Sequence, residues 1–401
     1  MPPAPRAVVV SPLLPFPPVS GGRKRTLRLL EAMERAGLAP AVITPDDADP
    51  AAAQALRARG WTVDVVAAHP ASLAGRAAQH AARRPSPFLR GVAARVRAAA
   101  PGSTLVQLEH TQSAYYLNAV GRVPAVLSLH NLDSELAATV ARGRRRGSAA
   151  WARDWSRARA TATVERRSIP RAARVLCVSE EDAVAVRELG GRPLLAPNGV
   201  DEELLALPAE RPAGEGVLFF GHLGYGPNRR GLERFLTEGW PAVRAQRPAA
   251  VLRVAGPGQD RALEHRLSAI AGVELLGLVE DVSAALAQAR VVLVPLWEGG
   301  GTRLKVLEAM AAAVPVAATP LGAARLGVED GREALLAGEP AGLAAALVRL
   351  LAEPELAARL AHAGRALAAP FVWRRALAEA EEFYALAART ATSNDRRGPA
   401  R

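Results

Sequence analysis

Short apolar runs that alternate with helical stretches constrain the fold of this 401-residue chain more than any other feature of its sequence. Strands are predicted over residues 7–10, 41–44, 62–66, 104–108, 125–129, 173–178, 217–220, 251–255, 273–276, 291–295 and 314–317. Helices are predicted between them, over residues 74–99, 135–169, 228–247, 281–289 and 303–312. Because strand–helix–strand repeats form parallel sheets, this pattern predicts an α/β fold.

A polar, proline-bearing stretch divides the alternating pattern into two sets, each consistent with a doubly wound, Rossmann-like sheet. The expected parts are a first domain over residues 1–205, a linker over 206–215, a second domain over 216–370, a helix over 371–389 and a disordered tail over 390–401. Ligands bind outside the carboxyl ends of the strands in such sheets, so the interdomain cleft is the expected active site.

Positive charge is concentrated in the first half of the chain. Residues 1–200 hold 28 Arg and Lys against 15 Asp and Glu, and residues 201–401 hold 23 against 24, which gives the net charge of +12. A basic half predicts an acidic partner: a phosphate-bearing ligand, an anionic membrane surface or nucleic acid. Aromatic residues make up 4% of the chain and no nucleic-acid-binding module is recognised, which argues against nucleic acid.

Cysteine content and the lengths of the apolar runs exclude other classes. The single cysteine, Cys177, excludes an intrachain disulfide and a cysteine-rich zinc site. The first residues make a poor secretory signal, and no apolar run approaches the length that spans a bilayer. We therefore expect a cytoplasmic protein, either free or docked peripherally at the inner face of the membrane.

The segment 295–310 carries the strongest chemical signal. Three consecutive glycines separate an apolar strand from a helix, so the backbone there can approach a ligand closely. The start of a helix favours an anion, and Arg303 and Lys305 add positive charge. Lys305 and Lys24 are the only lysines among 51 basic residues, which favours positions that need a compact ammonium group, with two lysines left over from a composition bias toward arginine as the alternative. Further into the helix, the carboxylate of Glu308 suits two adjacent hydroxyls, as on a ribose.

This segment resembles the glutamate-bearing nucleotide-sugar motif of glycosyltransferase family four, retaining enzymes of the GT-B fold, in the variant G-x-G-x-R-x-K-x-L-E-A-M-A. The resemblance implies that Glu308 holds the ribose of a nucleoside-diphosphate sugar. The family's usual first glutamate, which holds the donor sugar, falls on Gly300 here, and Glu298 is the candidate to replace it. The groups that would receive the diphosphate belong to Gly300, Gly301, Thr302, Arg303 and Lys305.

Further segments resemble the same family. The loop after residue 220 resembles the start of its nucleotide-binding domain, and the loop at 277–281 resembles the one that brackets the nucleobase. A Gly-Gly pair after the first strand resembles the loop that faces the donor phosphates, with a plain turn as the alternative. Residues 371–374 and Tyr384 resemble the helix that crosses back onto the first domain. The donor-binding candidates from these loops are Gly21, Gly22, Gly221, Asn228 and Val279.

Polar residues also follow two other strands of the first half. His130 follows the strand at 125–129 and matches the family's active-site histidine, with a helix-capping loop histidine as the alternative. Acceptor-binding candidates are Arg23, Lys24, Glu109 and His110, and a surface loop is the alternative for the last two. The basic stretches 83–97 and 142–146 fit a solvated face, docking on an anionic membrane or attraction of a phosphorylated acceptor.

These residues together predict an enzyme that moves a sugar from a nucleoside-diphosphate sugar to the hydroxyl of a small molecule, a glycan or a lipid-linked acceptor. Fixed cations would stabilise the leaving diphosphate, so neither a metal nor a cofactor is expected. By resemblance the anomeric configuration is retained. The catalytic candidates are His130, Arg303 and Lys305. The alternatives are a sugar-nucleotide epimerase, a non-catalytic nucleotide-sugar-binding protein and, more distantly, a nucleic-acid-binding protein.

Overall fold

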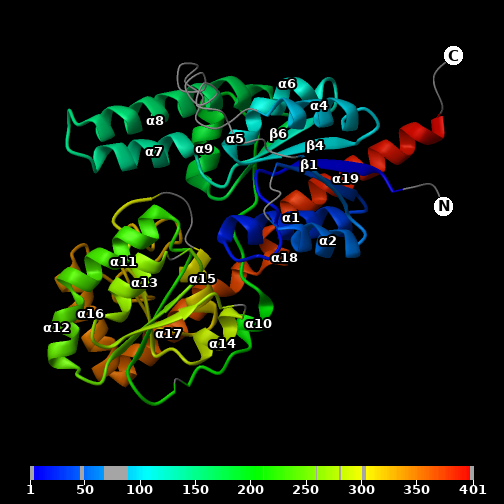
Figure 1. Ribbon diagram of the computed structural model, residues 1–401. Coiled ribbons are helices and arrows are strands. Elements are labelled where there is room, and N and C mark those ends of the chain that lie inside the picture. The colour runs from blue at the N-terminus through cyan, green and yellow to red at the C-terminus, as the bar shows by residue number, and fades with distance from the viewer. Residues whose placement is uncertain are drawn as a thin grey trace. The chain divides into compact units, whose positions relative to one another are not determined.

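The structure is a computed structural model that describes residues 4–45, 49–66, 89–210, 212–258, 260–279, 281–299 and 304–397 (Figure 1). The chain divides into two compact units. The first unit comprises Met1–Pro197 together with Leu377–Arg401, and the second comprises Asn198–Ala376.

The first unit is built on a parallel sheet of seven strands in the order β3-β2-β1-β4-β5-β6-β7. The strands are β1 Arg6–Val10, β2 Ala39–Thr44, β3 Thr62–Val65, β4 Leu105–Glu109, β5 Ala125–Ser128, β6 Arg174–Cys177 and β7 Pro193–Leu195. The sequence predicted the first six of these. It missed β7 because this edge strand has only three half-buried residues and begins with a proline.

Helices cover both faces of this sheet, as a doubly wound topology requires. They are α1 Gly21–Arg35, α2 Pro50–Ala58, α4 Arg90–Ala99, α5 His110–Ser113, η1 Ala114–Tyr116, α6 Leu117–Val120, α7 Asp133–Arg142, α8 Ala149–Ser168, η2 Ile169–Arg171, α9 Glu180–Glu188 and α19 Ala378–Arg397. The helix expected over 135–169 is therefore two helices, α7 and α8, which lie side by side (Figure 1). The helix expected over 74–99 falls largely outside the described residues, which begin again at Leu89.

The second unit repeats the plan with a parallel six-stranded sheet in the order β10-β9-β8-β11-β12-β13. Its strands are β8 Gly216–Phe220, β9 Val251–Ala255, β10 Val273–Gly277, β11 Val291–Val294, β12 Val316–Ala318 and β13 Leu335–Leu336. Side chains alternate along β8, so that Val217 and Phe219 enter the core on one face of the sheet while Leu218 and Phe220 enter the core on the other.

The helices of the second unit are α10 Glu202–Leu205, α11 Gly226–Glu238, α12 Trp240–Gln246, α13 Arg261–Ser268, α14 Val282–Ala287, α15 Leu304–Ala311, α16 Pro340–Ala352, α17 Pro354–Ala368, η3 Ala369–Phe371 and α18 Trp373–Ala376. The single helix expected over 228–247 is divided at Gly239. A Cβ at this position would lie 2.6 Å from the ring of Phe235 and 2.8 Å from the carbonyl oxygen of Pro340, so close packing requires a glycine where α11 gives way to α12.

The border between the units differs from the expected position at residue 205. Residues 198–205 belong to the second unit because Val200 pairs with Val372, with its N–H 2.8 Å from the carbonyl oxygen of Phe371. Leu204 is buried in the core of the same unit. The terminal segment is likewise divided: residues up to Ala376 belong to the second unit and residues from Leu377 onward belong to the first.

The expectation of a disordered tail over 390–401 is wrong for its first part, because α19 continues to Arg397. The hydroxyls of Thr390 and Thr392 donate to the carbonyl oxygens four residues earlier, at 2.9 and 3.0 Å, which lets both residues remain helical. Residues 398–401 lie outside the described residues. Within the described part of the chain, no helix has the length and apolar character that crossing a bilayer requires.

Candidate functional site

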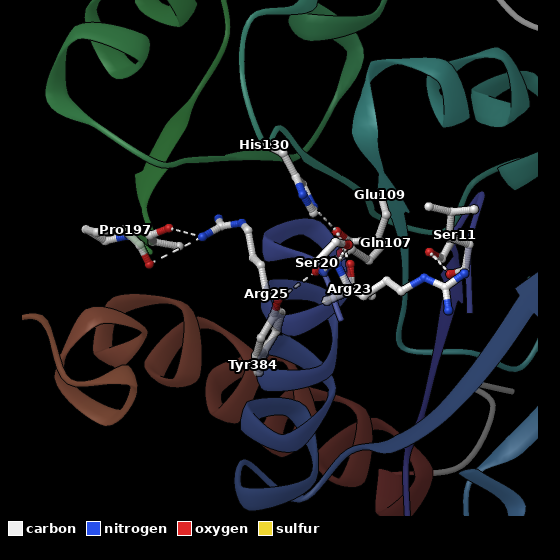
Figure 2. A network of polar contacts seen from close by, with 12 residues as sticks. Ser11, Ser20, Arg23, Arg25, Gln107, Glu109, His130, Pro197 and Tyr384 are labelled. Atoms are coloured by element: carbon white, nitrogen blue, oxygen red, sulfur yellow. Dashed lines mark hydrogen bonds and ion pairs between the residues drawn. The ribbon is translucent and has the colours of Figure 1, made fainter. Parts of the chain in front are cut away.

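The first unit gathers polar side chains at the carboxyl edge of its sheet. Strands β1, β4 and β5 are neighbours, so the residues that follow them meet at one edge. Glu109 ends β4, His110 follows it, and His130 lies two residues beyond the end of β5. The sequence singled out all three, and the structure brings them together. Figure 2 shows Glu109 beside His130.

A buried carboxylate holds the imidazole of His130. Oε2 of Glu109 lies 2.8 Å from Nε2 of His130, the glutamate side chain is fully buried and the histidine side chain is 8% exposed. Thr26 donates its hydroxyl to the same carboxylate at 3.3 Å, and the amide of Gln107 donates to Oε1 at 2.5 Å. With these donors aimed at its two oxygens, Glu109 accepts a hydrogen bond from the Nε2–H of His130, and Nδ1 of His130 keeps its lone pair.

Burial controls the charges in this cluster. It raises the pKa of Glu109, against the hydrogen bond from Gln107 and the charges of His110 and Arg25, which lower it. It lowers the pKa of His130 well below its ordinary value, and the charge of Arg25 acts in the same direction. The pKa of His110 falls to about 3 for the same main reason, with His130 as the second cause. Both imidazoles are therefore neutral at pH 7.

The two imidazole rings face the first turn of α1. Their centroids lie 3.7 Å apart, and His110 adopts a left-handed backbone conformation with φ of 63°. A Cβ built on Gly22 would lie 3.5 Å from Nδ1 of His130 and 3.5 Å from Cε1 of His110. A side chain at this position would cover the Nδ1 lone pair, so the glycine keeps that atom open toward the start of α1.

The start of α1 carries the predicted glycine loop. Ser20 caps the helix by accepting from the N–H of Arg23 at 3.4 Å, and Gly21 and Gly22 form the first turn. The guanidinium of Arg23 reaches the carbonyl oxygen of Phe16 at 3.5 Å, and Lys24 continues the helix. This turn thus presents backbone N–H groups together with two cations, as an anion-binding loop needs.

Two members of the cluster were missed from the sequence. Arg25 is 1% exposed, and its Nη1 donates to the carbonyl oxygens of Ala196 at 2.5 Å and Pro197 at 3.3 Å. Burial lowers its pKa, and the charge of Glu109 opposes that effect. Arg25 lies four residues before Leu29 on the buried face of α1, so helical periodicity could have identified it.

Gln107 connects the cluster to the last helix of the chain. The hydroxyl of Tyr384, in α19, donates to Oε1 of Gln107 at 2.6 Å, which turns the amide NH2 toward Glu109 (Figure 2). All three side chains are fully buried. The strand pattern predicted Gln107 only as part of a buried strand, and no local signal pairs it with a residue 277 positions later.

A second buried carboxylate lies beside this cluster. Oε1 of Glu165, in α8, accepts from the hydroxyl of Thr111 at 3.3 Å and from the N–H of Ser134 at 3.2 Å. Burial raises the pKa of Glu165 to about 7, against the hydrogen bonds from Ser134 and with a contribution from the charge of Asp133. Burial also raises the pKa of Asp133. These acids tie α5, α7 and α8 together.

In the second unit, Lys305 lies at the carboxyl end of β8. Its Nζ donates to Oδ1 of Asn228 at 2.9 Å and lies 4.9 Å from the centroid of the Phe219 ring. The amide of Asn228 donates in turn to the carbonyl oxygen of His222 at 3.0 Å. The structure thus brings together three sequence-predicted donor-binding residues, Gly221, Asn228 and Lys305.

Gly221 is required by this arrangement. Its φ is 150°, which side chains rarely adopt, and a Cβ there would lie 2.7 Å from Nζ of Lys305 and 2.9 Å from Nδ2 of Asn228. A larger residue would push the ammonium group away from the end of β8. The glycine therefore fixes the place of a cation in the first turn of α15.

The remaining donor-side candidates are placed less closely together. Glu308 is buried in α15, and Val279 follows β10 and packs against the core. Glu298 forms an ion pair with Arg230 of α11, so its charge is already balanced by a cation. Gly300, Gly301, Thr302 and Arg303 lie outside the described residues. Among the residues that the structure does describe, no group of three or more His, Cys, Asp or Glu side chains is arranged to hold a metal ion.

Two family models match the chain. The family described as "Glycosyltransferase Family 4" matches residues 19–204, and the one described as "Glycosyl transferases group 1" matches residues 214–353. The phosphatidyl-myo-inositol mannosyltransferase of Mycobacterium leprae is 32% identical over 194 residues, which are 46% of this chain and 51% of that protein. Its counterpart in Mycolicibacterium smegmatis is 31% identical over 179 residues, which are 42% of this chain and 46% of that protein. The chain thus spans about half the length of these curated relatives.

Solved structures resemble nearly the whole chain. Sucrose-phosphate synthase from Thermosynechococcus elongatus superposes with a TM-score of 0.72 at 21% identity, covering 97% of this chain and 100% of that one. Anabaena HepE in complex with UDP-glucose has a TM-score of 0.66 at 17% identity, covering 97% of this chain and 99% of that one. WaaG, a glycosyltransferase involved in lipopolysaccharide biosynthesis, has a TM-score of 0.66 at 17% identity, covering 94% and 99%. The predicted GT-B fold is thereby confirmed.

Proposed function

This chain belongs to glycosyltransferase family 4, and from that premise we propose that it transfers a sugar from a nucleoside-diphosphate sugar to an acceptor hydroxyl. The observation that carries the proposal is the position of Lys305 beside Gly221. An ammonium group in the first turn of α15 calls for an anion, because the positive end of the helix dipole otherwise opposes a cation there.

The diphosphate of the donor is the anion that fits. As the glycosidic bond breaks, its electron pair passes to the leaving phosphate oxygen, and negative charge grows there. Lys305 is held by Asn228, so its charge needs little reorganisation to stabilise that oxygen. We propose that this fixed cation takes the place of a metal ion, and that the reaction needs no cofactor.

Glu308 and Val279 complete the proposed nucleotide site. The carboxylate of Glu308 would accept hydrogen bonds from the ribose hydroxyls, as in the family that the motif resembles. Backbone groups near Val279 would contact the base. Glu298 is a weak candidate for the donor sugar because Arg230 already pairs with it.

In this proposal, the neutral side chain of His130 in the first unit accepts a hydrogen bond from the substrate. Nδ1 of His130 is a hydrogen-bond acceptor that faces the glycine turn of α1, and Glu109 fixes this tautomer. We assign Glu109 a positioning role in place of acceptor binding, because its carboxylate is fully buried. Arg23, Lys24 and His110 remain the proposed acceptor-side residues.

The proposed transfer retains the anomeric configuration. The acceptor oxygen forms a bond to the anomeric carbon on the face that the diphosphate leaves, and the acceptor proton passes to the departing phosphate oxygen. We take the proposed acceptor class from the relatives, which are named for transfer of mannose to phosphatidyl-myo-inositol. The proposed acceptor is therefore a hydroxyl of a lipid-linked molecule or a glycan. We also propose that the reaction takes place in the cytoplasm.

A thermal-shift panel of nucleoside diphosphates and their sugars, followed by product analysis with lipid and glycan acceptors, tests the proposal. A correct nucleotide at a hundredfold excess over its Kd should stabilise the fold by about 2.7 kcal/mol. Lys305→Ala should remove that shift and lower kcat about a hundredfold. Arg349→Gln, an exposed cation of α16 paired with Glu353, is the matched control and should change neither.

Three results would contradict the proposal. Full turnover by Lys305→Ala would refute the role of this cation. Conversion of the donor without an acceptor would indicate an epimerase. Nucleotide binding with no reaction on any acceptor would favour a non-catalytic binding protein, the alternative raised by the pairing of Glu298 with Arg230.

A further inference from the structure

Arg25 lies on the face of α1 that contacts the buried histidine cluster of the first unit (Figure 2). Arg25 and Thr26 are three and four residues beyond Gly22, and residues at this spacing share a helix face. A Cβ on Gly22 would lie 3.5 Å from Nδ1 of His130, and the hydroxyl of Thr26 donates to Oε2 of Glu109 at 3.3 Å. The helix therefore brings a guanidinium group to the carboxylate and the imidazole that it packs against.

The charge of Arg25 is fixed in a buried place. The residue is 1% exposed, and its Nη1 donates to the carbonyl oxygens of Ala196 at 2.5 Å and Pro197 at 3.3 Å. Carbonyl oxygens are neutral, so these hydrogen bonds hold the guanidinium without cancelling its charge. In an interior of low dielectric, such a charge acts more strongly on neighbouring groups than it would in water.

Five elements of the first unit contribute other titratable groups around Arg25 and Glu109. They are His110 in α5, His130 after β5, Cys177 in β6, Asp182 in α9 and Tyr384 in α19. Burial raises the pKa of Tyr384, raises that of Cys177 to about 12 and lowers the pKa of both histidines, so these four groups are neutral at pH 7. Asp182 is 2% exposed, and its charge acts on Arg25. Arg25 is thus the buried cation among these groups.

Glu109 and His130 share one proton in this arrangement. Nε2–H of His130 donates to the carboxylate, and Nδ1 has a lone pair. Burial of the carboxyl favours the uptake of a second proton from water. With two protons in the pair, Nδ1 carries a hydrogen both in a neutral acid beside a neutral ring and in a carboxylate beside an imidazolium. The acceptor that faces the glycine turn would then be a donor.

We propose that Arg25 is a positioning residue that keeps this second proton out of the Glu109–His130 pair, so that Nδ1 of His130 stays a hydrogen-bond acceptor. A fixed positive charge repels an added proton, and the charge of Arg25 lowers the pKa of both members of the pair. For Glu109 this effect opposes that of burial. The consequence for turnover rests on the proposed function, whereas the protonation of the ring does not.

Nitrogen chemical shifts of protein labelled with ¹⁵N-histidine test the proposal directly. The chain has seven histidines, and the signals of His130 are identified by their loss in His130→Asn. In the native protein, Nδ1 should stay unprotonated from pH 6 to pH 9. Arg25→Gln removes the charge and keeps an amide donor, so Nδ1 should be protonated at pH 6 and lose that proton toward pH 9. Arg25→Lys keeps the charge and should match the native protein at pH 6.

Turnover should follow the same dependence on pH. Relative to the native protein, kcat of Arg25→Gln should be about tenfold or more lower at pH 6 and within about threefold at pH 9, with the KM for the donor unchanged. At pH 6, Arg25→Lys should retain kcat within about threefold. Arg35→Gln is the matched control, because it removes an exposed cation of the same helix that pairs with Glu381. It should change neither the His130 signals nor kcat.

Three results would overturn the proposal. The first is a protonated Nδ1 in the native protein at pH 7, which decides the matter even if melting curves show that neither Arg25 variant folds. The second is Arg25→Gln with native His130 signals over the whole range. The third is equal changes in Arg25→Gln and Arg25→Lys, which would assign the effect to the lost bonds with Ala196 and Pro197. The nucleotide thermal shift should persist in every variant and the His130 signals need no substrate, which separates this failure from failure of the transferase.

Discussion

The hydroxyl of Tyr384 donates to Oε1 of Gln107 at 2.6 Å across 277 residues of sequence. This bond fixes which end of the Gln107 amide faces Glu109, and Glu109 in turn holds Nε2 of His130. The tautomer of one histidine therefore depends on the last helix of the chain.

Replacing Tyr384 by Phe should loosen this alignment while filling the same space. Oε1 of Gln107 would lose its partner in a buried place, which should lower the free energy of unfolding by about 1 to 3 kcal/mol. We expect kcat to fall about threefold to tenfold with little change in the KM for the donor. Nitrogen chemical shifts of His130 would report the tautomer directly. Phe383→Leu, the preceding residue on α19, should leave those shifts unchanged; if it moves them equally, packing is the cause.

Glu109→Gln should show that Glu109 positions His130 and takes no part in binding the nucleoside diphosphate. The neutral amide can donate to Nε2 as well as accept from it, so His130 no longer holds one tautomer. Turnover should fall about tenfold or more, whereas stabilisation by nucleoside diphosphate should stay the same. Steady-state kinetics and thermal shifts on the same preparation provide the comparison. An undiminished kcat would remove Glu109 from the mechanism.

The buried carboxyl of Glu165 should make stability depend on pH. The carboxyl ionises near pH 4.5 in the unfolded chain and near pH 7 in the folded one, so the folded state binds the additional proton between these values. Stability should therefore fall as the pH rises through this window and stay lower above it. Glu165→Gln cannot ionise, so its stability relative to the native protein should rise by about 2 to 3 kcal/mol from pH 5 to pH 8. Urea unfolding at both pH values measures this, with the exposed Glu188→Gln as the matched control.

Gly221→Ala should displace Lys305. The new Cβ would meet Nζ at 2.7 Å in a backbone conformation that alanine resists, and we expect a loss of about 1 to 3 kcal/mol of stability. The nucleotide-induced thermal shift should disappear with it. Gly338→Ala is the control, since no atom lies within 4 Å of a Cβ at that position. A Gly221→Ala protein that binds nucleotide normally would show that the ammonium position does not matter.

Removal of divalent cations should leave the transfer unchanged. Because Lys305 supplies fixed positive charge for the leaving diphosphate, EDTA should alter kcat by less than about twofold. The assay needs purified protein and a donor free of magnesium. Loss of activity in EDTA, restored by magnesium, would contradict metal independence.

The sequence predicted the central strands well because continuous apolar runs are typical of strands buried on both faces. Strand β13, with two residues, is too short to produce such a run. His130 was found because it follows a predicted strand, and Lys305 because it lies at the start of a helix after three glycines. Helical periodicity could have identified Arg25 on the buried face of α1. Gln107 and Glu165 were missed because the partners that explain their burial come from distant segments. No pattern among neighbouring residues in the sequence identifies partners that lie so far away along the chain.

The first unit is assembled from both ends of the chain, with the whole second unit inserted between them in the sequence. During synthesis, the ribosome must therefore release residue 384 before the hydrogen bonds behind His130 can close. The second unit ends at Ala376, so its proposed nucleotide site can form before the hydroxyl of Tyr384 reaches Gln107.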